Sequence, residues 1–119
     1  MVSHESTTKV INTNSSLELS EQEIYSLSIK ATNKDGVAAR KLGVYYSAIK
    51  LDDDMAEYWY LIGAENGDVV CQYNLAYSYL HRKKDEVRRE KAIYWLRKAA
   101  STGDPDSIKY LNRLGVPLN

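Results

Sequence analysis

The stretch AEYWYLIGAENGD at residues 56–68 appears a second time, as AIYWLRKAASTGD, at residues 92–104. The two copies lie 36 residues apart, and six of their thirteen positions are identical. A weaker copy, EIYSLSIKATNKD, lies 33 residues before the first copy, at residues 23–35. A fixed period in the thirties is typical of helical solenoids, in which each repeat is a pair of helices packed on the next pair. The repeat therefore predicts an all-α fold.

The composition excludes several classes of protein. The 119 residues carry a formal net charge of zero, which argues against a general nucleic-acid binder or a membrane-surface binder. Residues 1–20 lack the basic start and apolar run of a secretory signal, and no stretch approaches 18 apolar residues. The sole cysteine, Cys71, excludes an internal disulfide and a cysteine-rich zinc site. We therefore expect a cytoplasmic protein that does not enter a membrane.

Capping and turn signals divide the chain into six helices with short connections. Ser20 and Glu23 have the spacing of a capping box, and Asn66-Gly67 and Gly103 are signals for helix C-termini. Asp104-Pro105 is a typical helix start. The expected helices cover about 21–33, 36–50, 54–66, 68–82, 88–102 and 105–114. Residues 1–20 are expected to form a flexible arm, residues 21–115 the repeat domain and residues 116–119 a short tail.

Two segments carry a resemblance to a known family. GDVVCQYNLAYSYL at residues 67–80 and KAIYWLRKAASTGD at residues 91–104 resemble the Sel-one-like repeat, a relative of the tetratricopeptide repeat. The matching positions are Gly67, Asp68, Cys71, Leu75, Ala76, Tyr79, Lys91, Ala92, Trp95, Lys98, Ala99 and Ala100. The resemblance covers about residues 23–114, and it implies protein–protein recognition without catalytic residues. We expect a right-handed α/α superhelix (solenoid) of about six antiparallel helices.

The repeat motif is interpreted as a packing code. Small residues such as Gly43 and Ala76 are expected to let helices approach closely. Trp59 and Trp95 occupy equivalent repeat positions and are expected in the core. Cys71 occupies the small core position of its helix, so we expect a buried, unreactive thiol.

The fourth expected helix is apolar on two faces. Cys71, Leu75 and Tyr79 share one face, and a second apolar stripe lies opposite. Such a helix is either buried all round or faces a partner. In related superhelices the first helix of each pair lines the concave surface, which implies a groove built from equivalent positions. The predicted partner-binding residues are Val37, Arg40, Val44, Val70, Tyr73, Tyr77, Leu80, His81, Lys109 and Arg113. Alternatively, the N-terminal helix, the arm at residues 1–20 or a second copy of the chain covers the stripe, so a homodimer stays open.

Two charged stretches have simpler interpretations. The basic run from Arg82 to Lys91 also contains Asp85, Glu86 and Glu90, so a solvated loop is expected; contact with an acidic partner or nucleic acid is the alternative. Asp52, Asp53 and Asp54 are expected to form a cap and turn, because the Gly-punctuated loop of a calcium site is missing.

These patterns predict a non-catalytic protein–protein interaction module. No nucleophile, base and oxyanion donor assemble in the sequence, and no metal-ligand motif or phosphate-binding loop is present, so we predict neither an enzyme nor a cofactor. One concrete role is a small bacterial immunity or inhibitor protein that binds and neutralises a cognate toxin or effector. The alternatives are an adaptor or scaffold in a cytosolic complex, or a self-associating structural repeat protein.

Overall fold

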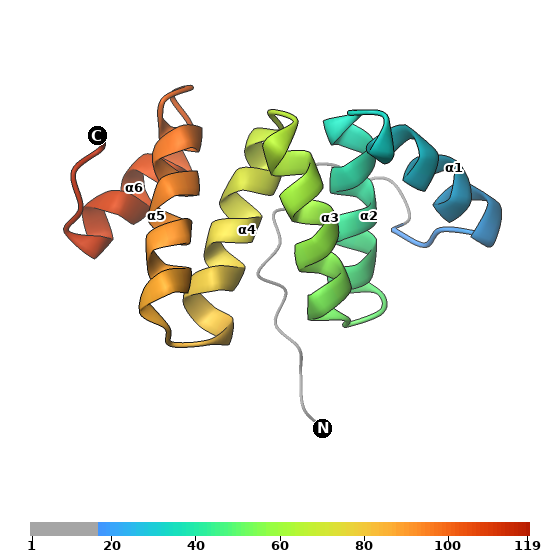
Figure 1. Ribbon diagram of the computed structural model, residues 1–119, viewed down its shortest axis with the longest axis horizontal. Helices are drawn as coiled ribbons and strands as arrows, with labels where there is room; N and C mark the ends of the chain where they lie inside the picture. The colour runs from blue at the N-terminus through green and yellow to red at the C-terminus, as the bar shows by residue number, and fades with distance from the viewer. Residues whose placement is uncertain (1–16) are drawn as a thin grey trace.

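The computed structural model describes residues 17–119, which contain six helices and no strand. The helices are α1 (Glu21–Thr32), α2 (Gly36–Ala48), α3 (Asp53–Glu65), α4 (Val69–Arg82), α5 (Glu86–Ala100) and α6 (Pro105–Leu114). They stand side by side in chain order, from α1 at one end of the stack to α6 at the other (Figure 1). The predicted all-α solenoid is confirmed. None of the helices in this part of the chain is long and apolar enough to cross a membrane.

Every helix begins at a residue whose side chain accepts a backbone hydrogen bond. The caps are Ser20, Asp35, Asp52, Asp68, Asp85 and Asp104. The predicted capping box is confirmed, since the Glu23 amide donates to the Ser20 hydroxyl at 3.1 Å and the Ser20 amide donates to the Glu23 carboxylate at 2.8 Å. A cap satisfies amides that have no partner inside the helix. The regular spacing of these caps sets the helix boundaries.

The fifth helix starts earlier than the sequence pattern suggests. It begins at Glu86 rather than near residue 88, because the Asp85 carboxylate accepts the amide hydrogen bond of Val87 at 2.8 Å. The connection between α4 and α5 is therefore only residues 83–85. Residues 1–16 of the expected arm lie outside the described residues. Leu17 and Leu19 are half-buried against the core, so the last part of the expected arm belongs to the folded domain.

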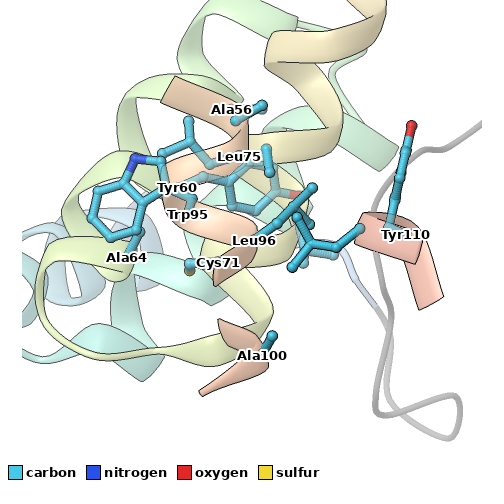
Figure 2. Close-up of a cluster of buried hydrophobic side chains, with 13 residues drawn as sticks. Ala56, Tyr60, Ala64, Cys71, Leu75, Trp95, Leu96, Ala100 and Tyr110 are labelled. Carbon is cyan, nitrogen blue, oxygen red and sulfur yellow. The ribbon is translucent and has the colours of Figure 1, made fainter. Parts of the chain in front are cut away.

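Two clusters of buried side chains form the core, and α3 contributes to both. The smaller cluster joins α1, α2 and Trp59 of α3. The larger cluster joins Ala56, Tyr60 and Ala64 of α3 to α4, α5 and α6, with Trp95 among its members (Figure 2). The prediction that both tryptophans are buried is confirmed. Because α3 faces both clusters, it holds the two halves of the stack together.

Small residues set the distance between the first and second repeats. A methyl group at Gly63 of α3 would overlap the Cys71 sulfur, and it would lie 3.0 Å from the Cys71 Cβ and 3.3 Å from the Ala39 Cβ. The predicted buried thiol is confirmed, and burial raises its pKa, so the thiol stays protonated. Gly43 is similarly close to the Tyr60 ring, as expected for a small residue at that position. These contacts let three helices meet without a gap.

We predict that Gly63→Ala destabilises the protein by about 2 kcal/mol, because an added methyl group forces closely packed neighbours apart. Chemical denaturation with circular dichroism measures the change. Cys71→Ala removes the sulfur that the new methyl group meets, so the double variant Gly63→Ala/Cys71→Ala should lose less stability than the sum of the two single variants. If the two losses are simply additive, the Cys71 sulfur does not limit how closely α3 approaches α4.

A second prediction concerns the turns that end α1, α3 and α5. Lys34, Gly67 and Gly103 occupy equivalent repeat positions, and all three have positive φ angles, of 74°, 88° and 92°. Only glycine adopts this conformation without strain, so Lys34→Gly should raise the free energy of unfolding by about 1 kcal/mol. Thermal denaturation measures the gain. The matched control is Lys30→Gly inside α1, which should destabilise the protein.

Candidate protein-interaction surface

The helices form two layers. Each helix contacts the next one in sequence, and in addition α2 contacts α4 and α1 contacts α3. Tyr110 of α6 lies against aromatic rings of α4, which places α6 beside α4. One layer therefore contains α2, α4 and α6, and the other contains α1, α3 and α5. We call the solvent side of the first layer the even-helix face and that of the second the odd-helix face.

Four aromatic side chains lie together on the even-helix face. Tyr73, Tyr77 and His81 occupy successive turns of α4, and Tyr110 joins them from α6. The Tyr110 ring centroid lies 6.1 Å from Tyr73, 6.0 Å from Tyr77 and 6.3 Å from His81. We call these four residues the aromatic row. Tyr73 and Tyr77 are half-buried and His81 is exposed, so part of the row is accessible from solvent.

His81 is fixed at the end of the row by three contacts. Its ring stacks on Tyr77 with a centroid distance of 3.9 Å and an interplanar angle of 9°. The His81 Nδ1 lies 2.9 Å from the Tyr77 carbonyl oxygen, and Nε2 lies 3.4 Å from the Tyr110 hydroxyl. A carbonyl oxygen only accepts, so Nδ1 carries the proton in this arrangement. The stacked pair thus presents a flat, preformed surface.

Tyr73 and Tyr110 keep their protons at neutral pH. Burial raises the pKa of the Tyr73 phenol, and the nearby Asp106 carboxylate raises it further. Burial also raises the pKa of Tyr110, with a smaller contribution from Tyr77. Neutral phenols combine a large apolar ring with a hydroxyl that can donate and accept hydrogen bonds. The row is therefore suited to a mixed apolar and polar contact.

The structure separates the predicted partner-binding residues into three groups. Half-buried positions on α4 are Val70, Tyr73, Tyr77 and Leu80, and exposed positions are Val37, His81, Lys109 and Arg113. Val44 is only 8% exposed and belongs to the larger core cluster, so its assignment to a contact surface is corrected. Arg40 donates to Asp68 at 3.2 Å and is largely covered, which commits its charge inside the protein.

Tyr110 is the member of the row that the sequence pattern misses. It lies 36 residues after Asn74, a buried position of α4, and its repeat register therefore indicates the core. The ring is indeed buried, yet one side of it touches the aromatic side chains of α4. The Arg113 guanidinium lies over the same ring, 5.4 Å from its centroid. Only the packing of α6 against α4 reveals this contribution.

Two arginines of the basic run are bound to α3, whereas the turn at residues 83–85 is exposed, as expected of a solvated loop. The Glu57 carboxylate accepts from Arg82 at 3.0 Å and from Arg88 at 2.7 Å, and the Ser78 hydroxyl also donates to it. Arg82 also pairs with Asp54 at 2.7 Å. We call Asp54, Glu57, Arg82 and Arg88 the ion cluster. It joins the first repeat to the turn of the second.

The acidic run at residues 52–54 forms the cap and turn that the sequence predicts. Asp52 accepts the Met55 amide at 3.1 Å, and Asp54 belongs to the ion cluster. Among residues 17–119, no group of histidine, cysteine and carboxylate side chains is arranged to hold a metal ion.

The odd-helix face carries a separate set of tyrosines. Tyr25, Tyr58 and Tyr94 occupy equivalent repeat positions and are 70%, 53% and 53% exposed. Tyr58 meets Trp59, and Tyr94 meets Trp95, in the same edge-on arrangement with centroids 4.9 Å apart. The repeated geometry indicates that Tyr58 covers Trp59 and that Tyr94 covers Trp95. These residues lie on the opposite layer from the aromatic row.

The two layers of paired helices define a helical-repeat protein with a partly exposed aromatic surface. A family model described as the Sel1 repeat matches residues 36–68 and 69–104, which correspond to α2–α3 and α4–α5. These matches cover more than half of the chain, and the chain belongs to the Sel1 repeat family. Sel1 repeats are non-catalytic modules that bind other proteins. Searches of curated proteins and of solved structures return no match.

The ion cluster leads to a pH-dependent prediction. Burial alone would raise the pKa of Glu57, but the hydrogen bonds from Arg88 and Ser78 outweigh it and the pKa is lowered. The ionised carboxylate therefore stabilises the fold above its unfolded pKa of about 4.3, and this contribution is lost as the pH falls through the lower folded pKa. Glu57→Gln should lower the free energy of unfolding by about 2 kcal/mol at neutral pH.

Urea denaturation of both proteins across the pH range checks this prediction. The stabilities of Glu57→Gln and the wild type should converge at acidic pH, where the wild-type carboxylate is protonated. Glu65→Gln is the matched control, because Glu65 is exposed on the same helix. Equal losses in the two variants, or a difference that persists unchanged at low pH, would contradict the role given to Glu57.

Proposed function

We propose that this protein binds another protein through its even-helix face, with Tyr73 and Tyr77 at the centre of the contact. Lys109 and Arg113 flank that centre from α6. The membership of the Sel1 repeat family supports protein recognition as the class of function. The observation that supports this particular surface is the aromatic row, whose Tyr73, Tyr77 and His81 stay partly exposed on α4 although Leu75 and Ala76 of the same helix are completely buried.

The chemistry of the row favours a protein partner. Tyrosine and arginine are the residue types that most often dominate the binding energy of protein interfaces. Stacking of His81 on Tyr77, and the position of Arg113 over Tyr110, hold these side chains before a partner arrives. A preformed surface loses less conformational freedom on binding, which favours affinity. Lys109 and Arg113 lie on this side together with the Asp106 carboxylate, so the partner should carry negative charge opposite Lys109 and Arg113.

Within this class we propose an immunity or inhibitor role, in which the protein neutralises a toxin or effector by covering it. Such a role requires a binding surface and no catalytic group. An adaptor or scaffold in a cytosolic complex uses the same surface in the same way, and the identity of the bound protein distinguishes the two roles. A toxin or nuclease bound in stoichiometric amount supports inhibition, whereas a complex of housekeeping proteins supports the adaptor role.

Self-association is a second candidate, supported by the free end of the stack. α1 exposes Tyr25 and Ile29 there, whereas the exposed residues Lys109, Asn112 and Arg113 make the α6 end polar. An apolar end without a covering helix can pair with its own copy. Self-association would be supported if light scattering shows a dimer and the Ile29→Asp variant is a monomer. A wild-type chain that is monomeric at the same concentrations would reject self-association.

The proposed contact predicts a difference between two double variants. The immobilised full chain should retain one stoichiometric partner from lysate of the cells that express it. Tyr73→Ala/Tyr77→Ala should weaken that binding at least about tenfold, because central tyrosines often contribute more than 1.4 kcal/mol each. Tyr58→Ala/Tyr94→Ala is the matched control, since it removes two exposed tyrosines from the odd-helix face and should leave binding unchanged.

Circular dichroism verifies that both double variants are folded. Arg113→Glu serves as a milder variant, because Arg113 is exposed and its charge reversal leaves the core intact. If only the control variant Tyr58→Ala/Tyr94→Ala loses the partner, the binding surface is on the odd-helix face instead. Unchanged binding in both Tyr73→Ala/Tyr77→Ala and Arg113→Glu would reject the even-helix face.

A further inference from the structure

An open pocket of about 560 Å³ lies beyond His81, at the end of the aromatic row. It is bounded by the end of α4, the turn at residues 83–85, the start of α5 and one side of α6. Its volume is within the range of about 300–1,000 Å³ that is typical of ligand pockets. His81 and Tyr110 belong both to the row and to the pocket wall, so the two surfaces are continuous.

One wall of the pocket is apolar and held in place by the ion cluster. Leu80 and Leu114 line it, together with the rings of Tyr79 and Tyr110. The Arg88 guanidinium lies 4.8 Å from the Tyr79 ring centroid, and Glu57 in turn binds Arg88. Glu57 therefore fixes the position of a pocket residue that it does not touch directly.

The other wall is positively charged. Lys83, Lys84 and Arg89 line the pocket, and within residues 17–119 no carboxylate forms an ion pair with any of them. Arg82 and Arg88, by contrast, are committed to α3. The Asp85 carboxylate on the rim accepts the Val87 amide, which occupies one of its oxygens. Of the six cations in the basic run, two arginines hold the fold and three face the pocket, whereas Lys91 does neither.

We infer that this pocket receives a glutamate or aspartate side chain, together with an adjacent apolar residue, from the bound protein. The inference rests on the proposed function and names the chemistry of the partner segment. The carboxylate would lie against the three cations and the apolar neighbour against Leu80 and Leu114. Asp85 and Glu86 on the same rim disfavour a polyanion such as nucleic acid, whereas a single carboxylate fits between them and the cations.

Nuclear magnetic resonance of the isotopically labelled full chain tests the inference with two defined probes. Acetyl-Leu-Glu-Glu-amide should shift the amide signals of residues 80–89 and 110–114 in a saturable way at low salt. Acetyl-Leu-Gln-Gln-amide has the same size without charge, and it should bind at least about fivefold more weakly. Higher ionic strength should reduce the difference between the two peptides, because exposed charges are screened.

Two triple variants locate the binding. Lys83→Ala/Lys84→Ala/Arg89→Ala should weaken binding of the glutamate peptide at least about fivefold. Lys30→Ala/Lys41→Ala/Lys50→Ala removes the same charge from exposed positions elsewhere and should have no effect. If the first triple variant does not fold, the comparison of the two peptides on the wild-type chain still decides the outcome.

Several results would overturn the inference. Equal binding of the two peptides would reject a carboxylate site, and equal weakening in both triple variants would reject this location. Inorganic phosphate that shifts the same amides at lower concentration than the glutamate peptide would assign the pocket to a phosphate group. The peptide test needs no lysate partner, and none of its variants alters Tyr73 or Tyr77, so its failure is distinguishable from failure of the proposed contact.

Discussion

The contact of Gly63 with Cys71 and Ala39 is the constraint on which the rest of the structure depends. It allows α3 to lie against α4 and α2 at the same point, where any larger side chain would separate them. The first residue of α2, Gly36, is also close to the next turn, since a methyl group there would lie 3.3 Å from the Asn66 carbonyl oxygen. Arg40 then reaches Asp68, which also caps α4. The spacing of the two repeats, and with it the even-helix face, follows from this junction.

The repeat motif and the aromatic row occupy different sides of α4. Cys71, Leu75 and Ala76 carry the family motif and are completely buried, so they explain the fold. Tyr73, Tyr77 and His81 lie outside the motif and on the accessible side. Family membership therefore gives the class of function, whereas the proposed contact depends on residues that lie between the motif positions.

The features that the sequence predicts well are those that depend on neighbours along the chain. Caps such as Ser20 and Asp104, and turns such as Gly67, follow local rules, so the helix boundaries differ by only a few residues from those expected. The burial of each side chain depends on how other helices pack against it, so burial is less predictable from the sequence. Val44 and Arg113 occupy equivalent repeat positions, yet α2 lies inside the stack and α6 at its end, so one is buried and the other exposed.

Contacts between distant residues escape the sequence pattern for a related reason. Arg82 and Arg88 lie 28 and 31 residues from their carboxylate partners, and nothing in the basic run distinguishes them from Lys83 or Arg89. The turn between α4 and α5 brings Arg82 and Arg88 toward α3, whereas Lys83, Lys84 and Arg89 line the pocket. A charge count over the run cannot make that division, because it depends on the direction of each side chain.

The ion cluster also bears on how the chain unfolds. In repeat proteins the stability of the array is approximately the sum of a term for each repeat and a term for each interface between neighbours. Glu57 and Asp54 belong to the first repeat and their arginine partners to the second, so these ion pairs contribute entirely to the interface term. A large interface term suppresses states in which one repeat is folded and its neighbour is open. With only two matched repeats, we expect the helices to melt together as one cooperative unit, without fraying from either end.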